Sequence, residues 1–302
     1  MKSPFLGLVL CLAVTTTHAQ KSPVKFGDVS IEELKMTQYA KDSSAAAVVL
    51  CDFGESAIRY SQNSGFSLNF ERTTRIKILK KDGLDWADFE IPLYDEGSSD
   101  EAISGLKAVT YNLENGKIVE TKMKNDGFFK EKFSDNLYLV KVALPNVKVG
   151  SVVEITYKIN SDFLMNFWDW EFQETIPVLW SEYRAAIPEF FNYDKYMQGY
   201  IPLDISDEDV VRTSINITTK ERTGEAWGGT QTNFSNDKID FNEKRFRWVA
   251  KDVPSFKAEP FITTYKDYIS KLNFELAYIK YPNQPIQPVL GSLGGNQQKI
   301  SR

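Results

Sequence analysis

The clearest alternation of hydrophobic and polar positions along the chain runs from residue 66 to residue 79. With one exception, its even positions carry apolar or small side chains, namely Phe66, Leu68, Phe70, Thr74, Ile76 and Ile78. The exception is Arg72. Because successive side chains of a strand point to opposite faces, this period of two predicts a β-strand with one buried face. Residues 80–83 then predict a turn, and residues 86–93 predict the strand that returns beside it.

Shorter segments repeat the pattern. Residues 109–113 and 118–122 flank Asn115-Gly116, a strong hairpin signal because both turn positions need a positive φ. Further strands are predicted at 45–50, before a turn at 51–54, and at 137–144, 152–159, 211–219 and 244–250. Ser30 and Glu33 form the capping box of a short helix, and a second helical stretch is predicted at 265–272. This succession predicts a mainly β protein, an antiparallel immunoglobulin-like β-sandwich with a short N-terminal helix.

Residues 1–19 have the pattern of a secretory signal peptide. Lys2 is followed by an apolar stretch at 5–14, and Thr17-His18-Ala19 resembles a cleavage site. The apolar stretch is too short to span a bilayer, and no later run approaches the length of a membrane span. We therefore expect an exported protein, periplasmic or secreted, with no membrane span in the mature chain.

Composition narrows the chemistry. The chain has 36 basic and 41 acidic residues, and its net charge of −5 argues against nucleic-acid binding. Its one histidine, His18, and one of its two cysteines, Cys11, lie in the leader, which leaves Cys51. These counts exclude a Ser-His-Asp or Cys-His triad, histidine-ligated zinc and paired-cysteine metal sites built from the mature chain alone. The glycines show no phosphate-binding spacing. We expect no catalytic residue, no metal and no cofactor.

Two groups of residues remain as candidate sites. The aromatic segment 167–172 and Trp180 form either a packed core or an exposed platform for a sugar or peptide, whose binding residues would be Trp168, Trp170 and Trp180. Cys51 ends an apolar run, which favours a buried structural thiol.

Carboxylates are the second group. They occur as Asp85 with Asp88, as Asp95-Glu96, and as Asp207-Glu208-Asp209. A carboxylate-based hydrolase requires two of them to face one cleft. Solvated loops are the alternative interpretation.

Several stretches resemble the N-terminal half of secreted bacterial transglutaminase-like proteins, in which a β-rich domain of unknown function precedes a transglutaminase core. The most distinctive are Phe70-Glu-Arg-Thr-Thr-Arg-Ile-Lys-Ile-Leu79, Leu144-Pro-Asn-Val-Lys-Val-Gly-Ser-Val-Val-Glu154, Trp170-Glu-Phe-Gln173 and Trp180-Ser-Glu-Tyr183. The likeness extends from about residue 26 to about residue 290. It implies a partner core in cis that carries a Cys-His-Asp triad, and no residue of this chain matches that triad.

After Ser292 the chain departs from the family pattern, which continues with a Trp-led helix toward the core. The tail 293–302 is instead polar and glycine-rich. A frameshift that truncates the protein before its core is one interpretation; a genuine short form, or a core on a separate chain, are the others. The predicted division is a signal peptide at 1–19, a helix and connector at 20–45, a β-sandwich domain at 46–255 and a connector toward the absent core at 256–302.

The expected function is a non-catalytic exported accessory domain of a transglutaminase-like protein. A carbohydrate- or peptide-binding module that uses exposed aromatics is the first alternative, and the carboxylate-based hydrolase is the second.

Overall fold

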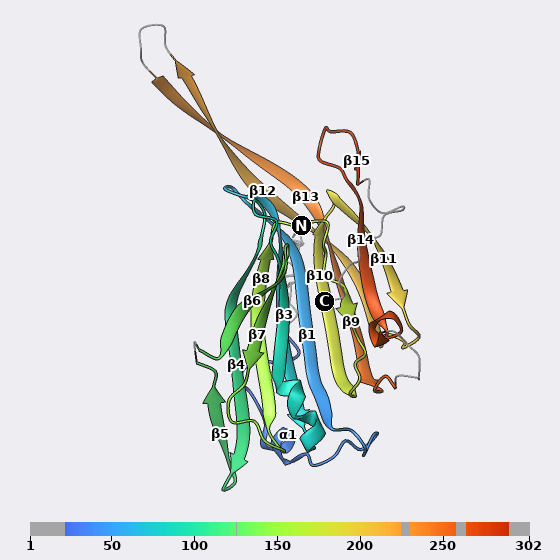
Figure 1. Ribbon diagram of the computed structural model, residues 1–302. Helices are drawn as coiled ribbons and strands as arrows, with labels where there is room; N and C mark the ends of the chain where they lie inside the picture. The colour runs from blue at the N-terminus through green and yellow to red at the C-terminus, as the bar shows by residue number, and fades with distance from the viewer. Residues whose placement is uncertain (1–21, 125, 225–229, 258–263, 290–302) are drawn as a thin grey trace, which may run out of the picture.

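Eight strands pair side by side in one large twisted sheet, which forms the first layer of a sandwich (Figure 1). The structure, a computed structural model, describes residues 22–289 except 125, 225–229 and 258–263. Across the large sheet the order is β12 (Ile205–Gly224), β13 (Thr230–Val253), β10 (Val178–Pro188), β1 (Ala47–Ser61), β2 (Gly65–Ile78), β8 (Val152–Ser161), β4 (Glu101–Glu114) and β5 (Lys117–Lys122).

Two smaller sheets form the second layer. One contains β11 (Phe191–Gln198), β14 (Lys271–Ile279), β15 (Gln287–Pro288) and β9 (Trp170–Glu171), and the other contains β3 (Asp88–Tyr94), β7 (Leu137–Ala143) and β6 (Phe128–Ser134). The helical elements are α1 (Ile31–Lys35) and the 3-10 turns η1 (Lys81–Ala87) and η2 (Tyr265–Asp267).

Side chains from all three sheets meet in one core. The even positions of β2 face inward, as the alternation predicts, and pack with Ile91 of β3, Val140 of β7 and Phe274 of β14. The predicted class, a mainly β sandwich, is confirmed. Strands β1 and β10 run parallel, whereas the other paired strands in the described part of the chain are antiparallel.

The N-terminal segment covers part of the opposite face of the large sheet. The predicted capping box is present, since Ser30 and Glu33 cap each other at the start of α1. Glu33 also accepts a hydrogen bond from Arg75, whose guanidinium is paired with the fully buried Glu154. The Nζ of Lys77 donates to the carbonyl of Leu34, and burial lowers the pKa of this lysine to about 8. Inward and outward faces of β2 are therefore both buried at this end.

The predicted hairpin is confirmed, whereas a predicted turn and a predicted strand pairing differ in the structure. The hairpin of β4 and β5 turns at Asn115 and Gly116, which have φ values of 50° and 75°. The turn expected at 51–54 is wrong, because β1 continues through these residues to Ser61. The strand at 86–93 exists as β3, but it pairs with β7 rather than with β2, and η1 separates the two strands.

The segment expected to be a connector contributes to the body of the sandwich. Within 256–302, β14 pairs with β11 and buries Leu272, Phe274 and Leu276. The helix predicted at 265–272 is reduced to the short turn η2. The predicted signal peptide at 1–19, with Cys11 and His18, and the tail 293–302 lie outside the described residues.

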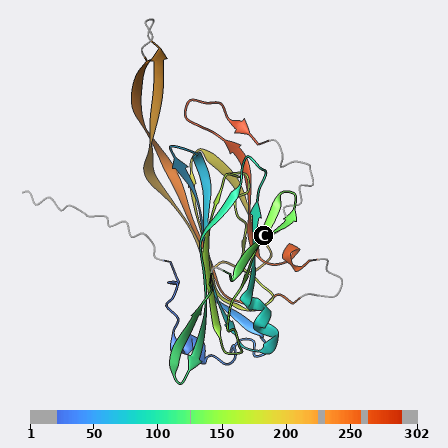
Figure 2. The ribbon, with the colours of Figure 1, turned by 60° about the vertical axis from the view of Figure 1, so that its left-hand side comes forward.

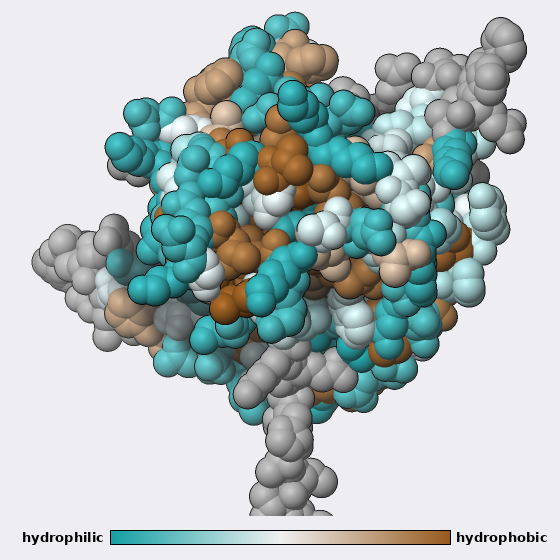
Figure 3. Space-filling model, turned by 90° about the horizontal axis from the view of Figure 1, so that it is seen from below, coloured by the Kyte–Doolittle hydropathy of each residue, from teal (hydrophilic) through white to brown (hydrophobic). Residues whose placement is uncertain are grey.

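Strands β12 and β13 extend well beyond the body as a two-stranded ribbon (Figures 1 and 2). Seen from below, hydrophobic side chains are visible in patches between hydrophilic ones (Figure 3). In the described part of the chain, no helix has the length and apolar character needed to cross a membrane.

Candidate functional site

The aromatic residues singled out as a binding platform lie between the layers. Trp168 and Trp170 are only 5% and 2% exposed. Trp168 stacks on Phe70 with ring centroids 4.8 Å apart, and Trp170 stacks on Tyr183 at 4.9 Å. The expectation of an exposed platform is wrong for these two rings, and the core interpretation is confirmed. Burial of large aromatic surface outweighs the cost of removing the indole N–H groups from water.

The polar atoms of this aromatic core are paired. The indole N–H of Trp170 donates to Ser181 at 2.9 Å, and the hydroxyl of Tyr183 bonds with Ser56 at 2.7 Å. Trp180, the third candidate, lies on the opposite face of the large sheet and is half-buried. Its indole N–H donates to Glu182, and the Nζ of Lys251 lies 4.8 Å from its ring centroid.

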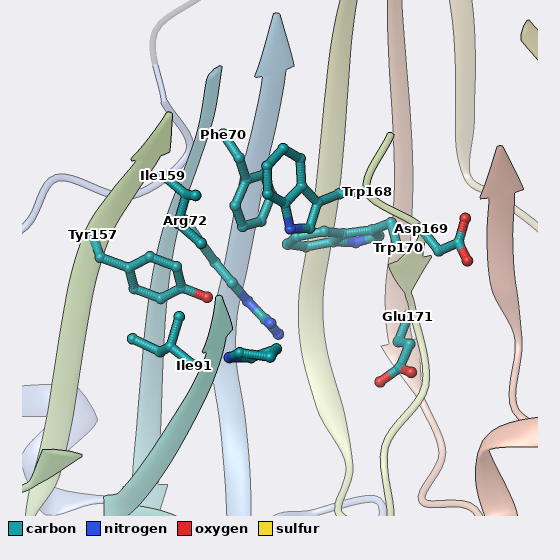
Figure 4. A pocket seen from close by; sticks show the side chains of 10 residues that line it. Phe70, Arg72, Ile91, Tyr157, Ile159, Trp168, Asp169, Trp170 and Glu171 are labelled. Atoms are coloured by element: carbon teal, nitrogen blue, oxygen red, sulfur yellow. The ribbon is translucent and has the colours of Figure 1, made fainter. Parts of the chain in front are cut away.

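Arg72 is the chemically distinctive residue of the core, and the sequence reasoning did not identify it as a site. It interrupts the apolar side of β2, so the alternation places its guanidinium inside the sandwich. There it makes two hydrogen bonds with Asp52, at 2.9 and 2.7 Å. Its Cζ atom lies 5.1 Å from the ring centroid of Trp170, and Figure 4 shows these two side chains together. Thr74 donates a third hydrogen bond to Asp52. The break in the alternation was the available signal.

A hollow beside Arg72 opens between the layers. Its lining consists of Phe70, Arg72, Ile91, Pro92, Tyr157, Ile159, Trp168, Asp169, Trp170 and Glu171. In Figure 4 the Arg72 side chain runs between Tyr157 and Trp170, and the Asp169 carboxylate points away from it. The volume of about 30 Å³ accommodates about one water molecule and is far too small for a sugar or a peptide. The Arg72–Asp52 pair links the neighbouring strands β1 and β2 on the core side of the sheet.

Glu171, within the aromatic segment, lines this hollow, and Glu174 follows the segment. Burial raises the pKa of Glu171, although Lys266 lies 3.6 Å away. Burial, and then the negative charge of Glu171, raise the pKa of Glu174 to about 7. The sequence reasoning did not flag either residue, because nothing in the local sequence shows that these two acids are covered by other elements.

The carboxylates that were flagged lie elsewhere. Asp85 is exposed within η1 and Asp88 is exposed at the start of β3, and Asp95 and Glu96 lie in the loop after β3. Glu208 is exposed on β12, between two aspartates that lie opposite arginines of β13. Of the flagged groups, Asp207 and Asp209 line one hollow together with Glu55, and each of the two aspartates lies opposite an arginine of β13.

We expect Glu174→Gln to change the pH dependence of stability. A folded-state pKa of about 7, above the ordinary 4.5, means that the folded state retains a proton that the unfolded state releases. The stabilisation by that proton is full below pH 4.5 and is lost as the pH rises through 7. Glu174→Gln should therefore remove this decline and raise the free energy of unfolding at pH 8 by about 2 kcal/mol.

Urea denaturation followed by tryptophan fluorescence between pH 4 and pH 8 measures the effect. Glu96→Gln, in an exposed loop, is the control and should leave the curve unchanged. An unaltered pH profile in Glu174→Gln would contradict the assignment.

Cys51 is buried, as the sequence predicts. Burial, followed by the negative charge of Asp52, raises the pKa of its thiol, which opposes formation of the thiolate. Within the described ranges, no three His, Cys, Asp or Glu side chains gather as they would around a metal ion.

Comparison with known proteins places this sandwich among domains without an assigned activity. No curated protein matches the chain. The chain is similar to the crystal structure of a protein from Parabacteroides distasonis ATCC 8503 that is provisionally assigned as a protease. The TM-score is 0.51 at 12% identity, and the match covers 77% of this chain and 41% of that one. An M1 zinc metallopeptidase from Deinococcus radiodurans has a TM-score of only 0.26 at 10% identity, over 67% of this chain and 43% of that one, and supports no argument.

The chain thus spans less than half the length of these solved structures, and the first of them shares its fold alone. The family model of a domain of unknown function with solved structures, DUF3857, matches residues 66–257. This range begins with β2 and ends after β13, so it contains Arg72, the aromatic core and both glutamates. The chain belongs to the DUF3857 family.

Proposed function

We propose that this chain is a non-catalytic, exported accessory domain that acts beside a transglutaminase-like core. The observation that carries the proposal is the environment of its one mature thiol. Cys51 is buried, and burial is the largest cause of its raised pKa; the negative charges of Asp52, Glu182 and Glu154 raise it further, and Arg75 lowers it by less than these together. A nucleophilic cysteine needs the opposite, a base or a cation that favours the thiolate. The single histidine of the sequence, His18, lies in the predicted leader.

The segments that carry the resemblance support the same role. In Trp170-Glu-Phe-Gln173, Trp170 and Phe172 are core residues, and Gln173 bonds to the carbonyl of Pro254 and to the N–H of Ser270. Such residues maintain the sandwich rather than present groups to a substrate. The likeness to transglutaminase-like proteins is therefore a likeness in scaffold, as an accessory domain requires.

The test begins with the chain itself. The exported chain is assayed for incorporation of a fluorescent primary amine into a glutamine-containing protein and for hydrolysis of peptide amides, beside its Cys51→Ser variant. We expect both proteins to be equally inactive, and iodoacetamide to label Cys51 only after unfolding. Amine incorporation or hydrolysis that disappears in Cys51→Ser would overturn the non-catalytic role.

The partner core is tested separately. About a kilobase of DNA beyond codon 302 is sequenced, enough for a further domain of typical size. A core with Cys, His and Asp found there is expressed and assayed with and without this chain. We expect the chain to change severalfold the kcat/KM of the core on a protein substrate and to leave its activity on a small dipeptide substrate unchanged. The absence of such a core, or its indifference to the chain, would refute the accessory role.

A further inference from the structure

The outer face of the large sheet carries ordered rows of charge. One row runs across the strands from Asp207 on β12 through Arg247, Arg184 and Glu55 to Glu71 on β2, each opposite the next in the strand register. The neighbouring row runs from Asp209 through Arg245 to the two small residues Ala186 and Ala57. Small side chains between charged rows leave a depression in the sheet surface.

Two adjoining hollows occupy this depression, and we call them together the outer cleft. The larger, of about 370 Å³, is lined by Glu55, Arg59, Arg184, Ala185, Ala186, Asp207, Asp209, Arg245, Phe246 and Arg247. The second, of about 280 Å³, shares Glu55 and Arg59 with it and continues to Lys158 and Asn160 on β8. From Asp207 on β12 to Lys158 on β8 the outer cleft crosses six adjacent strands, and Ser104 of β4 lines its far end. Five inter-strand spacings give it a length of roughly 24 Å, which matches about seven residues of extended chain.

Buried carboxylates hold the arginines of the cleft in place. Glu243, whose side chain is 3% exposed, pairs with Arg59 at 2.7 Å and with Arg245 at 2.8 Å. Glu182, whose side chain is fully buried, pairs in the same way with Arg184 and Arg247. Each group of two guanidiniums and one carboxylate has a net charge of +1.

Arg59 and Arg245 retain donors for a ligand. Each uses one guanidinium nitrogen on Glu243, and their side chains are 49% and 53% exposed. A guanidinium has five N–H donors in a planar fork that matches a carboxylate. A carboxylate placed between the two would receive charge-assisted hydrogen bonds from groups that are already ordered, so little side-chain entropy is lost on binding.

Carboxylates in the cleft determine which other charges a ligand can carry. Asp207 and Asp209 line the β12 side of the cleft, and Glu55 lies in the middle where the hollows join. Counting the lining of both hollows with Glu182 and Glu243, four arginines and Lys158 face six carboxylates. A ligand with only negative charge would be repelled, whereas a chain that presents both signs is complementary.

We propose that the outer cleft binds an extended polypeptide segment of about seven residues that carries a carboxylate near a basic side chain. The carboxylate lies between Arg59 and Arg245, and the basic group lies against Asp207 and Asp209. This binding needs only residues of this chain, and it is independent of the proposed partner core.

The probe is the acetylated heptapeptide Ala-Lys-Ala-Glu-Ala-Lys-Ala, and its control has Gln in place of Lys and Glu. Binding is followed by methyl NMR of the ¹³C-alanine-labelled chain at 50 mM salt. We expect the charged peptide to give saturable shifts of Ala57 and Ala186 and none of Ala47, which is fully buried in the core. The neutral peptide should give none, and 300 mM salt should weaken binding because the charges are screened.

Arg245→Gln leaves Glu243 paired with Arg59, so the negative charge of Glu243 remains compensated. We expect it to weaken binding at least tenfold. Arg212→Gln should leave binding unchanged, because Arg212 is exposed on the face of β12 opposite to Asp207 and Asp209. Equal shifts with the neutral peptide, or none at millimolar charged peptide, would overturn the proposal. Heparin that shifts the same alanines when the peptide does not would also overturn it, in favour of a polyanion site.

Discussion

Replacing Gly54 with alanine is expected to destabilise the protein by about 3 kcal/mol, at the upper end of the cost of overpacking a core. A Cβ atom at Gly54 would lie 2.2 Å from a ring carbon of Trp170. That ring cannot withdraw, because it stacks on Tyr183 and its N–H is bonded to Ser181. Urea denaturation of the two proteins, followed by far-UV circular dichroism, measures the difference in the free energy of unfolding.

A double-mutant cycle separates this clash from a general effect of the substitution. Trp170→Ala is itself expected to cost about 3–5 kcal/mol, the usual loss for truncating a buried aromatic. Once the ring is absent, the added methyl group has space, so Gly54→Ala with Trp170→Ala should be no less stable than Trp170→Ala alone. Additive costs of the two substitutions would show that the methyl group of residue 54 does not meet the indole.

The second large effect is expected for Arg72→Met. Loss of the guanidinium leaves the Asp52 carboxylate, which is 6% exposed, with the hydroxyl of Thr74 as its remaining hydrogen-bond donor in the structure. Breaking a buried ion pair by removal of one partner costs about 3–5 kcal/mol, and the partial exposure of Arg72 places the expected loss near 3 kcal/mol. Urea denaturation at pH 7 measures it.

Two further variants test the explanation. Arg212→Met removes an exposed guanidinium from β12 and should change stability by no more than about 0.5 kcal/mol. Arg72→Met combined with Asp52→Leu removes both charges, so it should be more stable than Arg72→Met alone. A double variant that is less stable than either single variant would contradict the interpretation that an unpaired carboxylate causes the loss.

Features that depend on a few neighbouring residues were predictable from the sequence. The alternation in β2 fixed which of its side chains share a face, because the period of a strand is two. The hairpin at Asn115-Gly116 and the capping box at Ser30 followed from local backbone geometry. The single histidine of the sequence limits the catalytic chemistry that its residue types allow.

Features that depend on what covers a face were not predictable. Alternation shows only that a strand has two faces. The N-terminal segment buries the outer face of the large sheet at one end, and this face is open over Ala57 and Ala186 at the other end. The pairing of β3 with β7 joins segments separated along the chain, and no local signal specifies such a choice. Trp168 and Trp170 are buried for the same reason, since the second layer covers them.

The sequence alone determined that this chain forms β-strands with alternating faces and that residues 19–302 hold no histidine for a histidine-dependent triad. Tertiary structure alone decided that Arg72 meets Asp52, that Glu171 and Glu174 are half-buried, and that four arginines line one cleft. Residue type and local spacing act over a few positions of the chain. Burial, charge pairing and cleft shape arise between strands that the sheet order brings together, and that order is set by the packing of the whole core.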